Sequence, residues 1–422
     1  MALPADHVIT AIRRPGGRWD VLAFIGSLDI GGCERHLATV YPPLAAAGLK
    51  VGIVTMTRGG LLEKEVRAKG VEIWCIDRGL ARRLRPLLGR WLSGYLAVLV
   101  GITDVARLLR SGRVAIAHFF LPGAYVLGGL AAVLARHRNL IMSRRSLNDY
   151  QANHPIASRI ERFLHARMRV LLANAKPVRA QLIAEGAAPR RTLVLYSGVD
   201  LAQLAIVTDR HAGRDRLSLA PDMLVIAIVA NLIPYKGHAD LIEALGRIAS
   251  RIEGKWALLV AGRDDGVGAS LQERAAALGI AENIRWLGIV DDVPALWRAA
   301  DIGVLASHQE GLPNSLMEGM ALGVPMVATA VGGVDDIATD GLDAILVPPR
   351  DPGALGSALL QLIRDPALRA RLGRAAATRI ASDFPLTACV DAYWRLYQLM
   401  LRQPNAAGED IAHQFQNRLS SK

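Results

Sequence analysis

Cysteine is scarce in this 422-residue chain, which contains three. Cys33, Cys75 and Cys389 are odd in number and far apart, so the sequence argues against a disulfide framework and against a thiolate metal site. Residues 1–18 lack the basic, apolar and small-residue pattern of a signal peptide. We therefore expect a protein of the reducing cytoplasm.

Several motifs that carry chemistry in other enzymes are missing. The chain has no G-x-G-x-x-G fingerprint, so a nicotinamide-dependent enzyme is poorly supported. His-Glu-x-x-His, Cys-x-x-Cys and P-loop motifs are also absent. These absences argue against zinc hydrolysis, thiol redox chemistry and P-loop phosphoryl transfer.

Lysine is also rare. It supplies 7 of the 50 basic residues, and arginine supplies the other 43. The net charge of +12 predicts an anionic partner or surface. Because lysine is rare, a lysine at the end of a predicted strand is a stronger functional candidate than it would be elsewhere.

The length favours two domains, and 52% hydrophobic with 21% charged residues indicates a globular protein. Short aliphatic runs alternate with helical patterns, which predicts parallel sheets covered by helices. The expected strands are residues 21–25, 51–55, 71–76, 170–174, 224–230, 256–262, 284–288, 302–305 and 325–328. The run 114–135 is uncharged, but Pro122-Gly123 breaks it, so we expect a buried strand, a turn and a helix.

A boundary between the two domains is expected near Tyr196–Asp200, with domains at 1–200 and 201–385. The apolar helical pattern of residues 386–402 follows the second domain. The last residues, 403–422, are polar, and we expect a loose tail there.

The most informative segment runs from Glu310 to Glu318, with seven residues between the two carboxylates. Pro313 suits a helix start, and Gly323 with Pro325 is a stop signal. The helix is therefore expected to begin between the glutamates. Since a helix N-terminus attracts phosphate, the two carboxylates would flank a bound phosphate and accept hydrogen bonds from hydroxyl groups on either side. That pattern is typical of a nucleotide-sugar site.

This segment, with its flanking text from Ser307 to Thr329, resembles the E-x7-E signature of glycosyltransferase family 4. The resemblance implies an α/β protein of the GT-B fold, with two Rossmann-like doubly wound domains facing across a cleft. It also implies a retaining enzyme that takes a sugar from a UDP- or GDP-linked donor. Glu310 would contact the donor sugar and Glu318 the ribose. The phosphate would lie at the turn and helix start formed by Gly311, Leu312, Asn314 and Ser315. In such proteins the C-terminal helix, here 386–402, commonly packs back on the first domain.

Lys236 is the second strong signal, because it follows the strand-like run 224–230. It would stabilise the negative charge of the leaving diphosphate. The family usually has an arginine at the position of Asn231, so one cation is missing here. A second cation must come from elsewhere or be absent.

Weaker candidates lie in the predicted loops. The Gly31-Gly32 turn resembles the family loop that approaches donor and acceptor, and His118 resembles a strand-end histidine near the donor sugar. Arg263 follows another strand. Arg144 or Arg145 could face the same cleft, and a surface position suits them equally. Gly332-Gly333 is expected to form a further turn.

No Asp-x-Asp pair occurs, so the metal clamp of GT-A transferases is missing and no metal or cofactor is expected. We expect Lys236, Glu310 and His118 to be catalytic. Two alternatives stay open: a nucleotide-sugar hydrolase or epimerase of the same fold, and a non-catalytic sugar-nucleotide-binding subunit.

The acceptor side depends on a basic segment with an apolar continuation. Arg78, Arg82, Arg83, Arg85 and Arg90 precede Trp91, Tyr95 and the run 96–102. This pattern suits a helix lying on anionic lipid, and it equally suits a core helix with a solvated basic end. With the resemblance, it predicts a lipid-linked or oligosaccharide acceptor at the inner face of the membrane, in polysaccharide or lipopolysaccharide biosynthesis, and no nucleic-acid partner.

Overall fold

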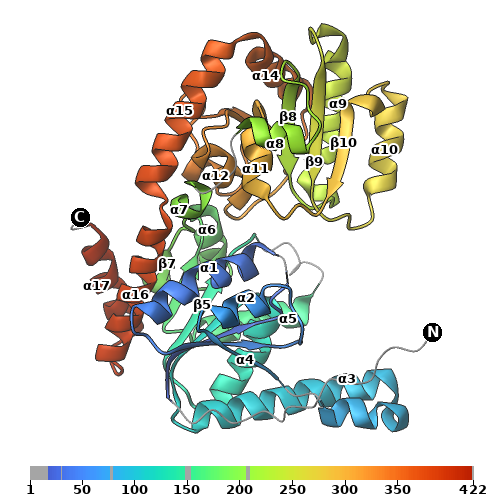
Figure 1. Cartoon of the computed structure of the whole chain (residues 1–422). Coiled ribbons are helices and arrows are strands. Elements are labelled where there is room, and N and C mark those ends of the chain that lie inside the picture. Colours follow the sequence, from blue (N-terminus) through green and yellow to red (C-terminus); the bar gives the residue numbers. More distant parts are fainter. Residues whose placement is uncertain (1–17, 30, 77–78, 148–153, 206–209, 421–422) are drawn as a thin grey trace.

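Two parallel β-sheets organise the chain, each with helices on both faces (Figure 1). The protein is known from a computed structural model that describes residues 18–29, 31–76, 79–147, 154–205 and 210–420. The first sheet belongs to an N-terminal domain and the second to a C-terminal domain. The expected fold of two doubly wound domains is thereby confirmed.

The N-terminal sheet has seven strands in the order β3-β2-β1-β4-β5-β6-β7. Its strands are β1 (Trp19–Ile25), β2 (Val51–Thr55), β3 (Glu72–Cys75), β4 (Val114–Phe120), β5 (Leu140–Arg144), β6 (Val170–Ala173) and β7 (Thr192–Val194). Its helices are α1 (Gly32–Ala46), α2 (Glu63–Ala68), α3 (Gly79–Arg110), α4 (Pro122–Leu134), α5 (Pro155–His165) and α6 (Lys176–Ala184), with a 3-10 turn η2 (Pro189–Arg191).

The C-terminal sheet has six strands in the order β10-β9-β8-β11-β12-β13. They are β8 (Leu224–Val229), β9 (Trp256–Ala261), β10 (Ile284–Gly288), β11 (Ile302–Leu305), β12 (Met326–Thr329) and β13 (Ile345–Val347). The helical elements are α7 (Leu201–Ala205), α8 (Arg210–Arg216), η3 (Pro234–Lys236), α9 (His238–Ile248), η4 (Ala249–Arg251), α10 (Gly268–Ala277), η5 (Ala281–Asn283), α11 (Val293–Ala299), α12 (Asn314–Ala321), α13 (Val334–Ile337), α14 (Pro352–Arg364) and α15 (Pro366–Asp383).

Most strands form where the sequence predicts them, because they are aliphatic runs buried on both faces; β5, β7 and β13 are not among the expected strands. All five residues of β2 are buried, and so are all six of β9. Sheets covered on both sides need such continuous apolar strands. The uncharged run 114–135 forms β4 and α4, as expected.

Each sheet reverses its winding direction at one place. In the N-terminal sheet β1 pairs with β4, and in the C-terminal sheet β8 pairs with β11. The chain winds outward in opposite directions from these pairs, so a crevice opens beyond their carboxyl ends. The loops after β1, β4, β8 and β11 are therefore placed to form a site.

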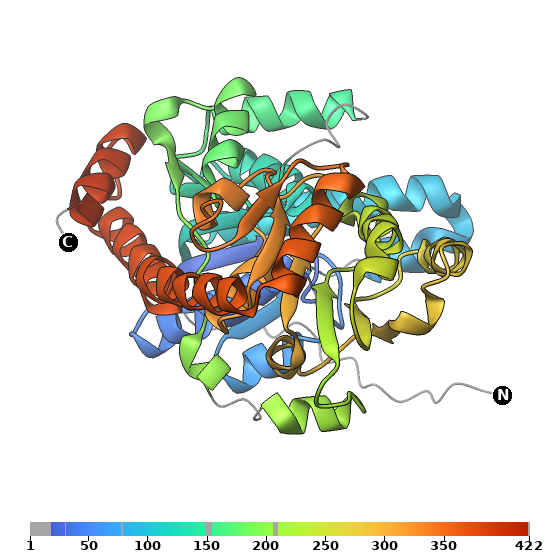
Figure 2. The ribbon, with the colours of Figure 1, turned by 90° about the horizontal axis from the view of Figure 1, so that it is seen from above.

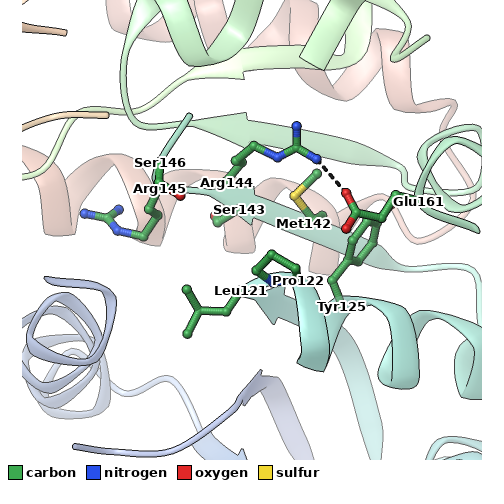
Figure 3. Close-up of a pocket in the computed structure, with 9 residues that line it drawn as sticks. All are labelled: Leu121, Pro122, Tyr125, Met142, Ser143, Arg144, Arg145, Ser146 and Glu161. Carbon is green, nitrogen blue, oxygen red and sulfur yellow. Dashed lines mark hydrogen bonds and ion pairs between the residues drawn. The ribbon is translucent and has the colours of Figure 1, made fainter. Parts of the chain in front are cut away.

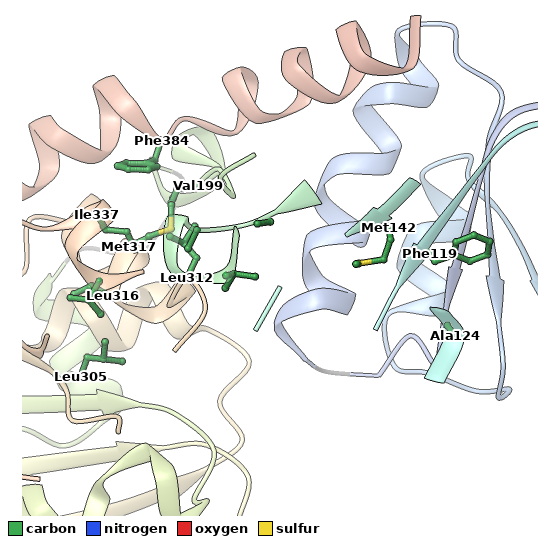
Figure 4. Packing of buried hydrophobic residues seen from close by; sticks show 14 of the residues in the cluster. Phe119, Ala124, Met142, Val199, Leu305, Leu312, Leu316, Met317, Ile337 and Phe384 are labelled. Carbon is green, nitrogen blue, oxygen red and sulfur yellow. The ribbon is translucent and has the colours of Figure 1, made fainter. Parts of the chain in front are cut away.

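The chain crosses between the domains twice, and the two crossings lie side by side. The Val199 amide donates to the Phe384 carbonyl at 2.9 Å, and the Leu386 amide donates to the Val199 carbonyl at 2.8 Å. Helix α16 (Leu386–Arg402) then lies against α1 and β4 of the N-terminal domain, with Tyr393 and Tyr397 buried. Apolar clusters link this helix to the N-terminal sheet and extend from the C-terminal domain into the N-terminal one (Figure 4).

The expectation of a loose tail at 403–422 is wrong for most of that segment. Helix α17 (Gly408–Ser420) packs beside α16 and β6, at the opposite side of the molecule from the outer part of α3 (Figures 1 and 2). Ile411, Ala412 and Phe415 are buried at this contact. Their i, i+1, i+4 spacing makes one narrow apolar face on a mostly polar helix, which a composition argument overlooks.

Candidate functional site

Lys236 and Glu310 meet at the point where the C-terminal sheet reverses. Lys236 ends η3, just after β8, and Glu310 lies in the loop after β11. The Lys236 ammonium group is 2.6 Å from Glu310 Oε1, and the Ser307 hydroxyl donates to the same oxygen at 2.7 Å. Both charged side chains are largely buried, with 19% and 10% of their surfaces exposed. Two residues 74 positions apart therefore form one charged unit.

Backbone contacts hold these two loops together. The His308 amide donates to the Tyr235 carbonyl at 2.7 Å, and the His308 ring bonds Asp240 at 2.7 Å. Gly237 has a φ of +69°, and a Cβ there would lie 1.9 Å from the Ala306 carbonyl oxygen. Only glycine fits this position, so the approach of the two loops is built into the sequence.

Helix α12 begins at Asn314, between the two glutamates, as the sequence predicts. Pro313 is its N-cap rather than its first helical residue, and no side chain caps the helix. Leu312, Leu316 and Met317 are buried and hold the helix start in place (Figure 4). The amides at Asn314 and Ser315 are thus presented at a rigid, positively polarised end.

The Gly332-Gly333 turn supports the segment before the helix. The Gly333 amide donates to the Gly311 carbonyl at 2.8 Å. Gly332 has a φ of +54°, and a Cβ there would lie 1.8 Å from the Glu310 carbonyl oxygen. This close approach fixes the backbone that carries Glu310.

A cavity of about 480 Å³ lies between the domains. The N-terminal domain lines it with parts of α1 and α2 and with residues 197–200. The C-terminal domain lines it with residues 289–291, 293 and 294 and with Asn314, Met317 and Glu318. Burial raises the pKa of Glu318 to about 7, although the Arg35 charge and the Trp297 side chain oppose the shift. A carboxyl group that gains its charge near neutral pH therefore opens on an interdomain cavity.

The Gly31-Gly32 turn meets the start of α12 from across the cleft. A Cβ on Gly32 would lie 3.6 Å from the Asn314 side-chain nitrogen. Gly31 is the N-cap of α1, and a Cβ there would collide with the Glu34 carboxylate at 2.3 Å. The loops after β1 and β11 are therefore neighbours, as the sheet topology predicts.

Two comparisons decide the family. Residues 30–203 match the family described as Glycosyltransferase Family 4, and residues 224–365 match Glycosyl transferases group 1. A D-inositol 3-phosphate glycosyltransferase of Salinispora tropica is 31% identical over 376 residues, which cover 83% of this chain and 77% of that protein. The chain belongs to glycosyltransferase family 4.

Two further likenesses agree with that assignment. The D-inositol 3-phosphate glycosyltransferase of Geodermatophilus obscurus is 35% identical over 249 residues, which cover 57% of this chain but only 54% of that relative. Among solved structures, Anabaena HepE in complex with UDP and glucose superposes with a TM-score of 0.75 at 20% identity, covering 88% of this chain and 97% of that one. The structural likeness establishes the GT-B fold of this family 4 protein.

Asn231 and Arg263 lie together in the family 4 site but supply no unpaired charge. The Asn231 side-chain oxygen accepts from the Arg263 amide at 3.2 Å. The Arg263 guanidinium binds Asp265 through two contacts of 2.7 and 3.1 Å. The Arg263 guanidinium is therefore already paired with a carboxylate, as the Lys236 ammonium group is.

His118 is not brought to the cleft surface. Its side chain is fully buried, its Nδ1 lies 2.7 Å from the Tyr397 hydroxyl, and its Nε2 lies 2.8 Å from the Ser143 hydroxyl. Burial, and then the Arg145 charge, lowers the pKa of His118 well below its usual range. The predicted contact with donor sugar has no support here, because His118 lies inside strand β4 and both ring nitrogens bond α16 or β5.

A small cavity of about 30 Å³ lies at the carboxyl end of β5, lined by residues that include Leu121, Tyr125, Arg144, Arg145 and Glu161 (Figure 3). The Arg144 guanidinium bonds Glu161 at 2.8 Å and also pairs with Glu185. Within the described residues, Glu161, His165 and Glu185 could hold a metal ion. Arg144 pairs with both carboxylates, so we interpret the cluster as a buried ion-pair network.

Sequence reasoning did not separate the two neighbouring arginines, Arg144 and Arg145. It also missed Ser197 as a lining residue of the interdomain cavity. The different environments of Arg144 and Arg145 depend on tertiary contacts that no local pattern encodes.

Proposed function

We propose that the protein is a retaining glycosyltransferase that moves a hexose from a UDP- or GDP-linked donor to an acceptor hydroxyl. The observation that carries the proposal is the Lys236–Glu310 pair at the reversal point of the C-terminal sheet. In open α/β sheets ligands bind at this point. The complex of HepE with UDP and glucose supports a nucleotide-sugar donor by analogy of fold.

The site residues take the following roles in this proposal. Glu310 accepts hydrogen bonds from the donor sugar, and Glu318 accepts them from the ribose. Lys236 and the amides at Gly311, Leu312, Asn314 and Ser315 hold the diphosphate, with Gly31, Gly32, Asn231 and Arg263 around it. No metal or cofactor is required, because cationic and amide groups supply the positive potential.

The chemistry follows as a displacement on one face of the sugar. The bond between the anomeric carbon and the diphosphate oxygen breaks, and the acceptor oxygen bonds that carbon from the same side. The departing phosphate oxygen takes the proton of the acceptor hydroxyl. Lys236 and the N-terminus of α12 stabilise the negative charge on the leaving group.

We further propose that the acceptor is lipid-linked or an oligosaccharide, in polysaccharide or lipopolysaccharide biosynthesis at the inner face of the membrane. Leu92, Tyr95 and Leu99 are spaced along one face of α3, and each is at least 60% exposed. Such a face suits contact with lipid. Arg78 lies outside the described residues, as do the side chains of Arg82, Arg83, Arg85, Arg90 and Trp91. None of the described helices is long and apolar enough to cross a bilayer.

A second acceptor class is favoured by the relatives. Two proteins about a third identical to this chain are named D-inositol 3-phosphate glycosyltransferases. A phosphorylated cyclitol is therefore the alternative acceptor. It needs no contact with a membrane.

The donor half can be tested without knowing the acceptor. UDP- and GDP-sugars are incubated with the protein, and the released nucleoside diphosphate is detected by mass spectrometry. We expect one donor to be turned over and Glu310→Ala to lower the rate about 100-fold or more, while Glu253→Ala, an exposed glutamate far along the chain from the motif, leaves it unchanged. Turnover by Glu310→Ala close to the rate of the unmodified protein would contradict the role proposed for Glu310. Without an acceptor, water takes the sugar and turnover is slow hydrolysis. Free-sugar release that added oligosaccharide or D-inositol 3-phosphate does not convert into transfer would favour a hydrolase, and donor binding without turnover would favour a non-catalytic subunit.

A further inference from the structure

Two neighbouring arginines at the end of β5 point in opposite directions. Figure 3 shows Arg144 turned toward Glu161 and Arg145 turned to the other side. Arg144 is the last residue of β5, and Arg145 is the next residue along the chain. Side chains that alternate along an extended chain reach opposite faces. One guanidinium therefore enters the interior of its domain, and the other points away from that network.

The environments of the two side chains differ in charge. Arg144 contacts two carboxylates, Glu161 and Glu185. The Arg145 Nη2 donates to the Ser197 hydroxyl at 2.5 Å, and its Nη1 is buried with no hydrogen-bond partner among the described residues. Among the residues that the structure describes, no carboxylate pairs with Arg145.

Buried neighbours of Arg145 are uncharged as well. Burial, and then the Arg145 charge, lowers the pKa of His36 and of His118 well below its usual range, so both rings are neutral. Burial raises the pKa of Cys33, Cys389 and Tyr393 above its usual value, although the Arg145 charge lowers each pKa in part. None of these groups is an anion at neutral pH.

The position of Arg145 connects it to the donor segment and to the interdomain cavity. A Cβ on Gly311 would lie 2.5 Å from the Arg145 carbonyl oxygen, so the backbone of Arg145 touches the turn that precedes α12. Ser197, which Arg145 bonds, lines the same cavity as His36, Asn314 and Glu318. An anion in that cavity beside Ser197 would be within reach of the guanidinium.

The Arg145 side chain is half-buried, and its buried Nη1 has no hydrogen-bond partner among the described residues, which is costly because burial removes water from a charged donor. Lys236 and Arg263 are both paired with carboxylates in this site. From these observations we infer that Arg145 binds a phosphate oxygen of the substrate and supplies, from the N-terminal domain, the second cation that Asn231 removes. The inference rests on the proposed function. The phosphate belongs either to the donor diphosphate or to a phosphorylated acceptor.

The experiment measures binding by calorimetry rather than turnover. Four probes are titrated into the full-length protein: UDP, GDP, inorganic pyrophosphate and D-inositol 3-phosphate. We expect Arg145→Gln to weaken at least one probe by about 10- to 100-fold, and Arg145→Lys to recover part of the loss. Arg251→Gln, which removes an exposed positive charge in η4, is the matched control and should bind as the unmodified protein does. Thermal unfolding checks that each variant is folded.

The pattern of loss identifies the source of the phosphate. Weaker binding of UDP or GDP and of pyrophosphate places Arg145 at the donor diphosphate, whereas weaker binding of D-inositol 3-phosphate alone places it at the acceptor. Affinities within about twofold of the unmodified values for every probe would overturn the inference, and so would the failure of the unmodified protein to bind any of them. Donor turnover is scored separately. Failure of the unmodified protein to turn over any donor counts against the proposed function and leaves the binding result to decide the role of Arg145.

Discussion

The ammonium group of Lys236 lies 2.6 Å from Glu310 Oε1, across two loops that follow adjacent strands. In the absence of substrate, the positive charge of Lys236 and the negative charge of Glu310 neutralise each other. A donor would exchange this contact for two others, with diphosphate on the lysine and sugar hydroxyls on the glutamate. The cation and the carboxylate are thus held next to each other at the carboxyl ends of β8 and β11.

Lys236→Met removes the charge that we propose stabilises the leaving diphosphate. We expect kcat to fall about 100-fold, the usual effect of losing one group that stabilises the charge of a transition state. Lys255→Met, at an exposed lysine beside the amino end of β9, should leave kcat unchanged. Steady-state rates with the best donor measure both variants, and a Lys236→Met enzyme that keeps more than about a tenth of kcat contradicts the assigned role.

Donor affinity should depend on pH through Glu318. The pKa of Glu318 is raised to about 7, so its carboxylate form, which we propose accepts hydrogen bonds from ribose, is lost as the pH falls below that value. We expect the Kd of UDP-glucose to rise about fivefold between about pH 7 and about pH 6. Glu318→Gln should bind more weakly at pH 8 and show no such dependence. An identical pH profile in the variant would separate Glu318 from donor binding.

Gly311→Ala should push the domains apart. The added Cβ would lie 2.5 Å from the Arg145 carbonyl oxygen and 2.9 Å from the Ser146 Cα, and neither backbone atom can move freely. We expect a loss of about 1–3 kcal/mol in the free energy of unfolding together with lower activity. Gly94→Ala in α3, where no atom lies within 4 Å, is the control. Denaturant titration compares the two, and equal stabilities would mean that this contact is not rigid.

His118→Ala should act on stability before it acts on chemistry. The variant leaves the hydroxyls of Tyr397 and Ser143 without their partner and opens a cavity, so the free energy of unfolding should fall by about 2–4 kcal/mol. Tyr397→Phe removes only the hydroxyl and should cost about 1 kcal/mol. Urea unfolding measures both effects. Unchanged stability with a large loss of kcat would restore the catalytic role that the sequence predicts for His118.

The exposed face of α3 should decide membrane contact. Serine at Leu92, Tyr95 and Leu99 together should lower sedimentation with vesicles containing phosphatidylserine by at least about tenfold, since each apolar side chain contributes on the order of 1–2 kcal/mol. Serine at the exposed Leu134, Ile156 and Leu342 is the control. Equal sedimentation of the two triple variants would remove the membrane from the proposal.

Much of the fold follows from the sequence because the relevant signals are local. Strands such as Val51–Thr55 and Ile302–Leu305 are continuous aliphatic runs, which parallel sheets need when both faces are covered. The start of α12 between Glu310 and Glu318 follows from Pro313, and its end from Gly323, which has a φ of +73°. These residues restrict the backbone directly, so reading them requires no knowledge of distant contacts.

The sequence by itself determined the two doubly wound domains, the family, and the candidate carboxylates and lysine of the donor site. Only the tertiary structure decided that Lys236 pairs with Glu310 and that α17 packs on the N-terminal domain. It also decided that both ring nitrogens of His118 form hydrogen bonds, one with Tyr397 and one with Ser143. It also separated Arg144, which has carboxylate partners, from Arg145, which has none among the described residues. The physical reason is that burial and charge pairing depend on which distant segments meet, and sequence spacing carries no record of that.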